Sequence, residues 1–361
     1  MKKPFDLTFA VGPTQISDAV KSDAMHSFSN NFLSVSHRGP EFTEISKHTV
    51  EQLRTYLNVP SDYEIFYTAS ATDAWETCAK NLVEKEAFAF TCGHFSEAFE
   101  KCLQAWGKKC YVNAATWGEI NDFKNVTIPK TAELITLCHN ETSTGVTCQQ
   151  SDIEFLQKQN PQSLLAVDIT SSVGCGIYNI SDADVWYFSV QKGLGLPSGL
   201  GVMIVSPKAM ERSKLLLKKG NPQGFFNFSN MQKQMAGDKY QTISTPNIFA
   251  IYLLGKQLER FNLDGNQKIN QTTLARAQKV YDFFDNHTKV KPFIEKKIHR
   301  SPYTICVEVN EEDLKNYKIK AAQKGIQLGS GYGALKNSTL RIANYPAITD
   351  KDMEKLYDIF K

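Results

Sequence analysis

The chain has 361 residues, 42% of them hydrophobic, and a formal net charge of +3. This length allows a full hydrophobic core and two domains. Because Lys and Glu are interspersed without a basic block, the charge indicates binding to neither nucleic acid nor an anionic membrane. No apolar run reaches the roughly 18 residues of a membrane span, and Asp6 and Gly12-Pro13 interrupt any signal-peptide core.

The eight cysteines show no C-x-x-C spacing. In a chain of this size without a secretory signal, such cysteines are typically reduced and mostly buried. We therefore expect a cytoplasmic protein.

The first two thirds of the chain alternate between short apolar runs and amphipathic stretches. Strands are predicted at 64–68, 87–91, 109–112, 134–138, 164–168, 185–190 and 201–205. In the stretch after the first strand, Ala71, Trp75, Cys78 and Leu82 share one helical face. Alternation of this kind predicts an α/β fold with a mostly parallel sheet covered by helices on both faces. Such sheets bind ligands beyond the carboxyl ends of their strands.

The last third is expected to form a smaller α+β unit. The segment 213–228 is predicted to be a long connection. The elements predicted after it are helices 246–260 and 268–286, strand 304–309, helix 312–324, strand 339–343 and helix 349–360, with Thr349 as N-cap. We expect a large domain at 1–255 and a small domain at 256–361, with the first residues, up to about residue 15, packed on the small domain.

Two of the predicted strand ends carry functional groups. The strand 185–190 leads to Lys192, and the strand 164–168 ends in Asp168. An apolar strand has no structural need for a terminal amine. A pyridoxal phosphate enzyme needs both groups, because the amine forms a Schiff base and the acid keeps the pyridine nitrogen protonated.

Nucleotide-binding motifs do not fit the residues around Lys192. The run from Gly193 to Ser198 has Ser where G-x-G-x-x-G requires its third Gly, and Lys192 precedes its glycines, whereas a Walker loop ends in Lys. The glycines instead predict a turn that lets the backbone pass close to a cofactor.

Two hydroxyl-rich segments are candidates for binding a phosphate. Ala69 to Asp73 join a strand to a helix, where free N–H groups and the helix dipole bind anions. Ser244 and Thr245 precede another predicted helix. The alternative for both segments is simple helix capping.

In this order and spacing, six segments resemble the class V aminotransferases of pyridoxal phosphate fold type I over nearly the whole chain. They are Val11-Gly12-Pro13-Thr14, Ser36-His37-Arg38-Gly39-Pro40-Glu41-Phe42, Asn140-Glu141-Thr142-Ser143-Thr144-Gly145, Val167-Asp168-Ile169-Thr170-Ser171-Ser172, Gln191-Lys192 and Leu340-Arg341.

The resemblance implies a pyridoxal 5'-phosphate transaminase with Lys192 and Asp168 as catalytic residues. Lys192 would form the Schiff base and move the substrate's α-proton, and Asp168 would pair with the pyridinium. Further implied cofactor contacts are stacking by Phe95, a hydrogen bond from Thr142, and phosphate binding by Ala71, Thr72, Gln191, Ser244 and Thr245. The last two would come from the partner in a homodimer, and no metal is implied. Core packing is the alternative role for Phe95.

The resemblance also implies an amino acid and a 2-oxo acid as substrates. Arg341 would bind the α-carboxylate, since a guanidinium meets it with two hydrogen bonds. His37 and Arg38 would contact the distal group or line the entrance from the neighbouring subunit. The segments favour a member that acts on phosphoserine and 2-oxoglutarate in serine biosynthesis. The alternative is the branch acting on alanine and glyoxylate or serine and pyruvate.

One sequence feature bears on the choice between these two branches. The segment from Ala69 to Thr72 has neither the glycines nor the arginine found in many phosphoserine-specific members, and resembles the alanine–glyoxylate branch more.

Two other classes of protein are alternatives. A cysteine desulfurase shares the fold, but the late cysteine, Cys306, lies in a predicted core strand. A phosphate- or metabolite-binding protein without activity would leave Lys192 without a purpose.

Overall fold

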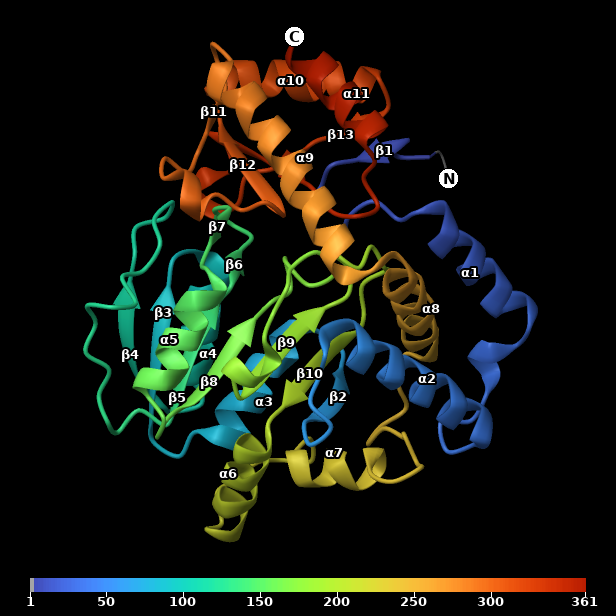
Figure 1. The fold of residues 1–361 in the computed structure, drawn as a ribbon, viewed down its shortest axis with the longest axis vertical. Helices are drawn as coiled ribbons and strands as arrows, with labels where there is room; N and C mark the ends of the chain where they lie inside the picture. The colour runs from blue at the N-terminus through green and yellow to red at the C-terminus, as the bar shows by residue number, and fades with distance from the viewer. Residues whose placement is uncertain (1–2) are drawn as a thin grey trace.

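The structure is a computed structural model that describes residues 3–361. Two separate hydrophobic cores organise it. Figure 1 shows a large sheet with its helices in the lower part of the view, and a smaller sheet with α9, α10 and α11 above it.

The large sheet has seven strands in the order β2-β10-β9-β8-β5-β3-β4. Only β10 runs antiparallel to its neighbours β2 and β9, and all the other pairs are parallel. In sheet order, the strands are β2 (Glu64–Thr68), β10 (Gly201–Val205), β9 (Val185–Ser189), β8 (Leu164–Asp168), β5 (Leu134–Cys138), β3 (Glu86–Thr91) and β4 (Lys109–Ala114). Strands β5, β8, β9 and β10 are buried along their whole length, as expected for a sheet covered on both faces.

Helices surround this sheet (Figure 1). They are α1 (Asp18–Ser29), α2 (Pro40–Leu57), α3 (Ala71–Leu82), α4 (His94–Ala105), α5 (Gln150–Gln159), α6 (Pro207–Lys218), α7 (Phe228–Met235) and α8 (Ile248–Asp264). The outermost, α1, packs on α8 rather than on the sheet. The helix α3 packs against α4, α6 and the sheet, while α2 packs along α8. The buried face of α3 includes the predicted Ala71, Trp75, Cys78 and Leu82. A two-stranded hairpin of β6 (Asn140–Glu141) and β7 (Val146–Thr147) stands beyond the end of β5.

The smaller sheet has the order β11-β12-β15-β14. These strands are Lys291–Pro292, Thr304–Glu308, Thr339–Ala343 and Gly329–Ser330, and the helices beside them are α9 (Asn266–Asn286), α10 (Glu311–Gln323) and α11 (Asp350–Phe360). The N-terminal strand β1 (Leu7–Thr8) pairs with β13 (Ile326–Gln327), and Leu7 and Phe9 join the second core. The position of a domain boundary near residue 255 stays a prediction.

Most predicted elements match the structure within two residues, and Thr349 caps α11 as expected, its side chain accepting from the N–H of Asp352. The exceptions lie around α6, α7 and α8. The segment 213–228 is not one long connection, because α6 continues to Lys218 and α7 begins at Phe228. Buried Ser213 and Leu216 give α6 an inward face that its run of lysines conceals. The helix expected from 246 begins at Ile248 and continues to Asp264.

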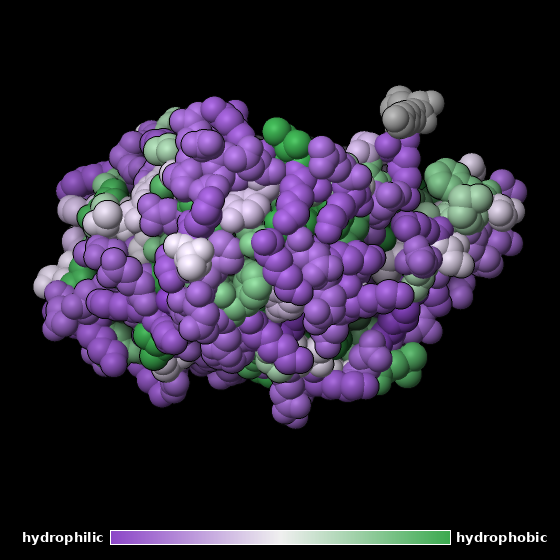
Figure 2. Space-filling view, turned by 90° about the horizontal axis from the view of Figure 1, so that it is seen from above, coloured by the Kyte–Doolittle hydropathy of each residue, from purple (hydrophilic) through white to green (hydrophobic). Residues whose placement is uncertain are grey.

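The surface seen from above in Figure 2 is mainly hydrophilic, with small scattered apolar patches. No helix in the described range 3–361 has the length and apolar character needed to cross a bilayer. Six of the eight cysteines are buried, and all eight are free thiols.

Candidate active site

Lys192 and Asp168 lie at the same edge of the large sheet. Strands β8 and β9 are parallel neighbours, with Asp168 paired to Tyr187. Asp168 is the last residue of β8, and Lys192 follows the end of β9 by three residues. Both side chains are buried, at 7% exposure each. They form no direct ion pair within residues 3–361, so each retains capacity for another partner.

The amine of Lys192 has two hydroxyl partners. Its Nζ donates to Thr142 Oγ1 at 2.7 Å and to Ser171 Oγ at 3.0 Å. Burial lowers the pKa of Lys192, and the negative charge of Asp168 opposes this shift. Gly12 lies against the lysine stem, and a Cβ there would be 3.0 Å from Lys192 Cε. Ser171 lies in one of the six resembling segments, but no sequence pattern distinguishes it from the other hydroxyl residues there.

Asp168 borders a small interior gap that has almost no free volume. Its Oδ1 accepts from the backbone N–H of Thr170 at 2.7 Å. Burial raises the pKa of Asp168, while its hydrogen bonds with Thr170 and the charge of Lys192 lower it. Phe95, Cys138 and Tyr187 line the same gap. A buried carboxylate can accept a hydrogen bond from a protonated ring nitrogen.

Phe95 covers the lysine from the first turn of α4. The Lys192 Nζ lies 4.9 Å from the centre of the Phe95 ring. Phe95 is half-buried and packs against the large hydrophobic core, so core packing and stacking on a cofactor both stay open. Tyr332, from the small unit, lies 5.4 Å from Phe95 and 4.6 Å from His94 between ring centres. No sequence pattern distinguished Tyr332, because its role depends on how the two units meet.

Arg341 reaches the same site from β15. Its Nη1 donates to the carbonyl of Thr142 at 2.9 Å and its Nε to the carbonyl of Ser330 at 2.8 Å. The guanidinium lies 5.3 Å from the centre of the Tyr332 ring. Burial lowers the pKa of Arg341, and no carboxylate pairs with it among residues 3–361. A partly buried cation without an anionic partner is a suitable receptor for a substrate carboxylate.

The turn after Lys192 packs closely against the chain's own backbone. A Cβ at Gly193 would lie 2.0 Å from the carbonyl oxygen of Val173, so the turn requires glycine here. The expected approach of this turn to a cofactor stays a prediction.

The start of α3 is partly used by its own cap. Ser70 and Asp73 form a capping box, and the N–H of Ala71 donates to Ser189 Oγ at 2.7 Å. Thr72 is exposed, and its N–H and hydroxyl have no hydrogen-bond partner in the described part of the chain. Gln191 is half-buried, and its carbonyl accepts from the N–H of Thr14. Thr72 and Gln191 are thus the groups here that keep side-chain capacity for a phosphate.

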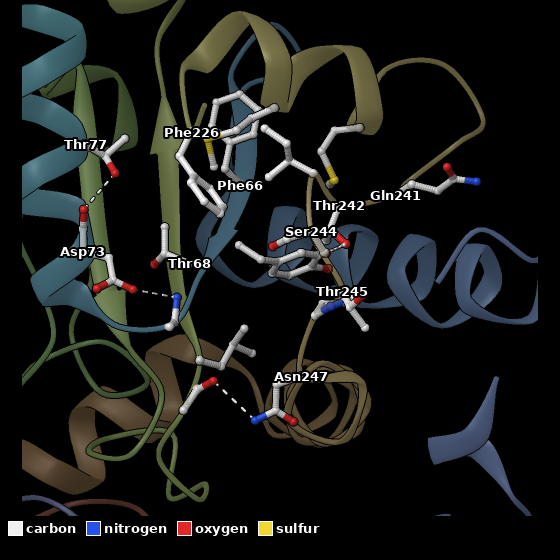
Figure 3. A pocket seen from close by; sticks show the side chains of 18 of the residues that line it. Phe66, Thr68, Asp73, Thr77, Phe226, Gln241, Thr242, Ser244, Thr245 and Asn247 are labelled. Atoms are coloured by element: carbon white, nitrogen blue, oxygen red, sulfur yellow. Dashed lines mark hydrogen bonds between the residues drawn. The ribbon is translucent and has the colours of Figure 1, made fainter. Parts of the chain in front are cut away.

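Ser244 and Thr245 line a separate cavity of about 370 Å³ that opens between the start of α3 and the segment before α8. Figure 3 shows them opposite Thr68 and Asp73. Both residues are exposed. Neither caps α8, because Asn247 takes that role through a 3.1 Å bond from the N–H of Ala250. The capping alternative is therefore wrong for this pair. Lys192 does not line this cavity.

Arg38 contacts two glutamines of its own chain rather than the hydroxyls around Lys192. Arg38 Nη1 donates to Gln234 Oε1 at 3.0 Å and to Gln241 Oε1 at 3.2 Å. These contacts place Arg38 beside the segment that carries Ser244 and Thr245, since Gln241 lines the same cavity as that pair.

The late cysteine is not available as a nucleophile. Cys306 is 1% exposed in β12, and burial raises its pKa to about 12. A desulfurase requires an accessible thiolate, which this environment disfavours.

Comparison with known proteins identifies the family. The sequence matches the family Aminotransferase class-V over residues 9–356. It is 28% identical to phosphoserine aminotransferase of Corynebacterium glutamicum, over 98% of this chain and 93% of that one, and 26% identical to phosphoserine aminotransferase of Rhodococcus opacus, over 98% and 94%.

Solved structures agree with this match. The crystal structure of a phosphoserine aminotransferase from Cytophaga hutchinsonii is 30% identical, with a TM-score of 0.95 over 99% of this chain and 98% of that one. An aspartate aminotransferase from Thermus thermophilus, at 21% identity and a TM-score of 0.85 over 98% of both chains, shares the fold. The fold is that of the pyridoxal phosphate enzymes of fold type I. The chain belongs to the class V aminotransferase family and is a transaminase that depends on pyridoxal phosphate.

Proposed function

We propose that this enzyme transfers the amino group of phosphoserine to 2-oxoglutarate, a step of serine biosynthesis. The observation that carries the proposal is the likeness over the full chain to proteins named phosphoserine aminotransferase, including a structure with a TM-score of 0.95. In this proposal, the residues around Lys192 supply the functional groups that transamination requires.

The site suits pyridoxal 5'-phosphate. The fit rests on Lys192, whose buried amine contacts hydroxyls rather than a carboxylate, and on Asp168, which is buried at the end of the neighbouring strand. When bound, the cofactor supplies a protonated aromatic ring that draws electrons from the bonds to the substrate's α-carbon. Phe95 would cover its ring, Thr142 would bond its phenolic oxygen, and Thr72 and Gln191 would hold its phosphate. Ala71 would join them only if its N–H left Ser189 Oγ, to which it donates.

Lys192 would perform the proton transfer. Burial lowers the pKa of its amine, so a larger share is neutral near neutral pH than for an exposed lysine. A neutral amine can take a proton from the substrate's α-carbon, and Thr142 and Ser171 orient it through their hydroxyls. Asp168 would remain ionised beside the pyridinium and maintain its protonation.

Arg341 would bind the substrate's α-carboxylate. Its Nε and Nη1 are held by two carbonyls, and the Tyr332 ring lies beside the guanidinium. These contacts orient the guanidinium without neutralising its charge. The carboxylate of any amino acid substrate would therefore gain a charge-assisted bond.

We further propose a homodimer in the cytoplasm with shared active sites. Ser244 and Thr245 are exposed, and within residues 3–361 their hydroxyls have no hydrogen-bond partner. Phe225 and Phe226, which precede α7, are 67% and 46% exposed. Exposed aromatic residues of this kind typically mark an interface. His37, Arg38, Ser244 and Thr245 would then serve the partner's site, with His37 and Arg38 near the substrate's phosphate.

One feature supports the second candidate, an alanine–glyoxylate or serine–pyruvate transaminase. The segment from Ala69 to Thr72 carries no arginine for a second phosphate. On the proposed function, Arg38 has to supply that charge.

The test is a single half-reaction of the purified holoenzyme with phosphoserine, alanine or serine. We expect rapid loss of the cofactor's visible absorbance with phosphoserine alone. Conversion by alanine or serine but not by phosphoserine would overturn the substrate assignment and leave the family assignment intact.

A further inference from the structure

The first turn of α4, which carries Phe95, has an unusual cap. The residue before it, Gly93, has no side chain with which to bond the free N–H groups of the helix. Instead, a side chain from β6 bonds them. Glu141 Oε1 accepts from the N–H of Phe95 at 3.3 Å, and its Oε2 accepts from the N–H of Ser96 at 3.0 Å.

Hydroxyl groups complete this arrangement. Glu141 also accepts from Ser143 Oγ at 2.6 Å and from Ser96 Oγ at 3.0 Å. Ser143 Oγ in turn accepts from the N–H of His94 at 2.9 Å. The first three N–H groups of α4 are thus all bonded by Glu141 and its neighbour Ser143.

The fit around the carboxylate is tight. Glu141 is completely buried. A Cβ at Gly93 would lie 2.5 Å from Glu141 Cγ and 2.5 Å from Ser143 Oγ. Residue 93 therefore has to be glycine for the carboxylate to reach the helix, since real Cβ contacts are longer than this.

The same short segment also contacts the other parts of the site. Thr142, which follows Glu141, accepts from Lys192 Nζ through its hydroxyl and from Arg341 through its carbonyl. The bonds of Glu141 therefore fix α4 to the segment that fixes the lysine and the arginine. The 4.9 Å separation between Lys192 Nζ and the Phe95 ring depends on this connection.

The charge of Glu141 also matters in this buried site. Burial lowers the pKa of Lys192, and the charges of Asp168 and Glu141 act in the opposite direction. Two buried carboxylates thus face two cations, Lys192 and Arg341. A buried carboxylate is costly unless its oxygens are bonded, and those of Glu141 accept from five donors.

We propose that Glu141 is a positioning residue of this transaminase, whose buried carboxylate holds the first turn of α4 so that the Phe95 ring stays over the amine of Lys192. The proposal rests on the proposed function, because it assumes that the Phe95 ring stacks on the cofactor. Glu141 acts through Phe95 and Thr142 and touches neither substrate nor the reacting atoms.

The test compares Glu141→Gln with Glu97→Gln. Glutamine keeps the shape of Glu141 but turns an amide donor toward N–H groups that themselves need an acceptor. Glu97 is a matched control in the same helical turn, where it bonds the indole N–H of Trp117 instead. Two readouts are needed: hydrogen exchange of the amides at 94–96 in the cofactor-free protein, and visible circular dichroism of the bound cofactor together with kcat and KM.

In Glu141→Gln we expect exchange at these amides to accelerate at least about tenfold, the loss typical of hydrogen bonds to a charged group. The visible dichroism should change and kcat should fall at least about tenfold, with KM for the amino acid nearly unchanged because Arg341 is still in place. Glu97→Gln should match the wild type in all of these. If Glu141→Gln does not fold, Ser143→Ala, which leaves the N–H of His94 unbonded, should show the same pattern with smaller changes.

Two results would overturn the proposal. Unchanged exchange would show that the carboxylate does not hold the helix, and faster exchange with wild-type dichroism and kcat would reduce Glu141 to a helix cap. A wild-type protein without a visible band or transaminase activity would refute the proposed function instead, and the exchange readout, which needs no cofactor, separates these failures.

Discussion

The amine of Lys192 donates a 2.7 Å hydrogen bond to the hydroxyl of Thr142, fifty positions earlier in the chain. Thr142 also accepts from Arg341 through its carbonyl. One threonine therefore connects the lysine that follows the large sheet to the arginine of the small sheet. A change in the relative position of the two units would alter the contact of Arg341 with Thr142, the residue whose hydroxyl also contacts the lysine.

Replacing Lys192 tests its covalent role. Lys192→Ala should abolish transamination, because among residues 3–361 Lys192 is the only buried lysine that could move the α-proton. Borohydride reduction followed by mass spectrometry should attach the cofactor to the peptide containing residue 192 in the wild type and in the exposed control Lys214→Ala, but not in Lys192→Ala. Wild-type turnover by Lys192→Ala would refute the assignment.

Replacing Asp168 tests the electron sink. Asp168→Asn keeps the size of the side chain but removes the charge that maintains a protonated pyridine nitrogen. We expect kcat/KM to fall by at least about 100-fold, or ~2.7 kcal/mol, the scale of one preorganised electrostatic contact. Asp182→Asn, just before β9, is the control. A fall of less than about tenfold, or ~1.4 kcal/mol, would argue against the pyridinium role.

The lowered pKa of Lys192 predicts a pH dependence. Attachment of the cofactor requires the neutral amine, so its rate in the cofactor-free protein should rise with pH and level off below the 10.5 of an ordinary lysine. The charge of Asp168 raises the pKa of Lys192. Asp168→Asn should therefore move the midpoint to lower pH. Stopped-flow absorbance would measure both profiles, and a midpoint moving upward would contradict the proposed electrostatics.

The sequence predicted the parts of this site that depend on local pattern. Fully buried strands such as β8 and β9 appear as continuous apolar runs, so a charged residue at or beyond their ends is conspicuous. Asp168 and Lys192 were recognised in this way, and the strand neighbours β8 and β9 bring them to one edge. Their individual roles stay predictions.

Other parts of the site depend on tertiary contacts that a single sequence does not display. Tyr332 reaches His94 only where the small unit meets α4. Glu141 appears in sequence as one polar residue within a resembling segment, and its contact with Phe95 spans 46 positions. The many lysines of α6 likewise obscure the spacing of its buried residues in the sequence, so the sequence predicts a connection there instead of a helix.

Arg341 should determine affinity for every amino acid substrate alike. Arg341→Ala removes a guanidinium that no carboxylate neutralises within residues 3–361, so KM for phosphoserine, alanine and serine should each rise by about 10- to 100-fold, the value of a charge-assisted hydrogen bond. Arg300→Lys, which keeps the ion pair with Asp285 elsewhere in the small unit, should change none of them. An increase confined to one substrate would assign Arg341 to a distal group instead.

Arg38 should distinguish phosphorylated substrates from the others. Its guanidinium bonds only neutral glutamine side chains within its own chain over residues 3–361 and so retains its charge for an anion. Arg38→Ala should raise KM for phosphoserine by at least about tenfold and leave alanine or serine nearly unaffected. Arg54→Lys is the control, since Arg54 bonds the carbonyls of Pro60 and Tyr63 at the far end of α2. Equal effects on the KM of all substrates would show that Arg38 does not bind the substrate's phosphate.

Mixing two inactive variants tests whether the sites are shared. One variant is Lys192→Ala, and the other replaces Ser244 by Ala and Thr245 by Val. If each site takes its lysine from one subunit and its hydroxyls from the other, a mixed dimer has one intact site and one with both defects. Random exchange after equal mixing should then restore about a quarter of the wild-type sites in a two-fold dimer. If Ser244 and Thr245 instead serve the lysine of their own chain, every site keeps one defect and mixing restores nothing. The exposed hydroxyls of this pair, unused by their own chain within residues 3–361, favour recovery.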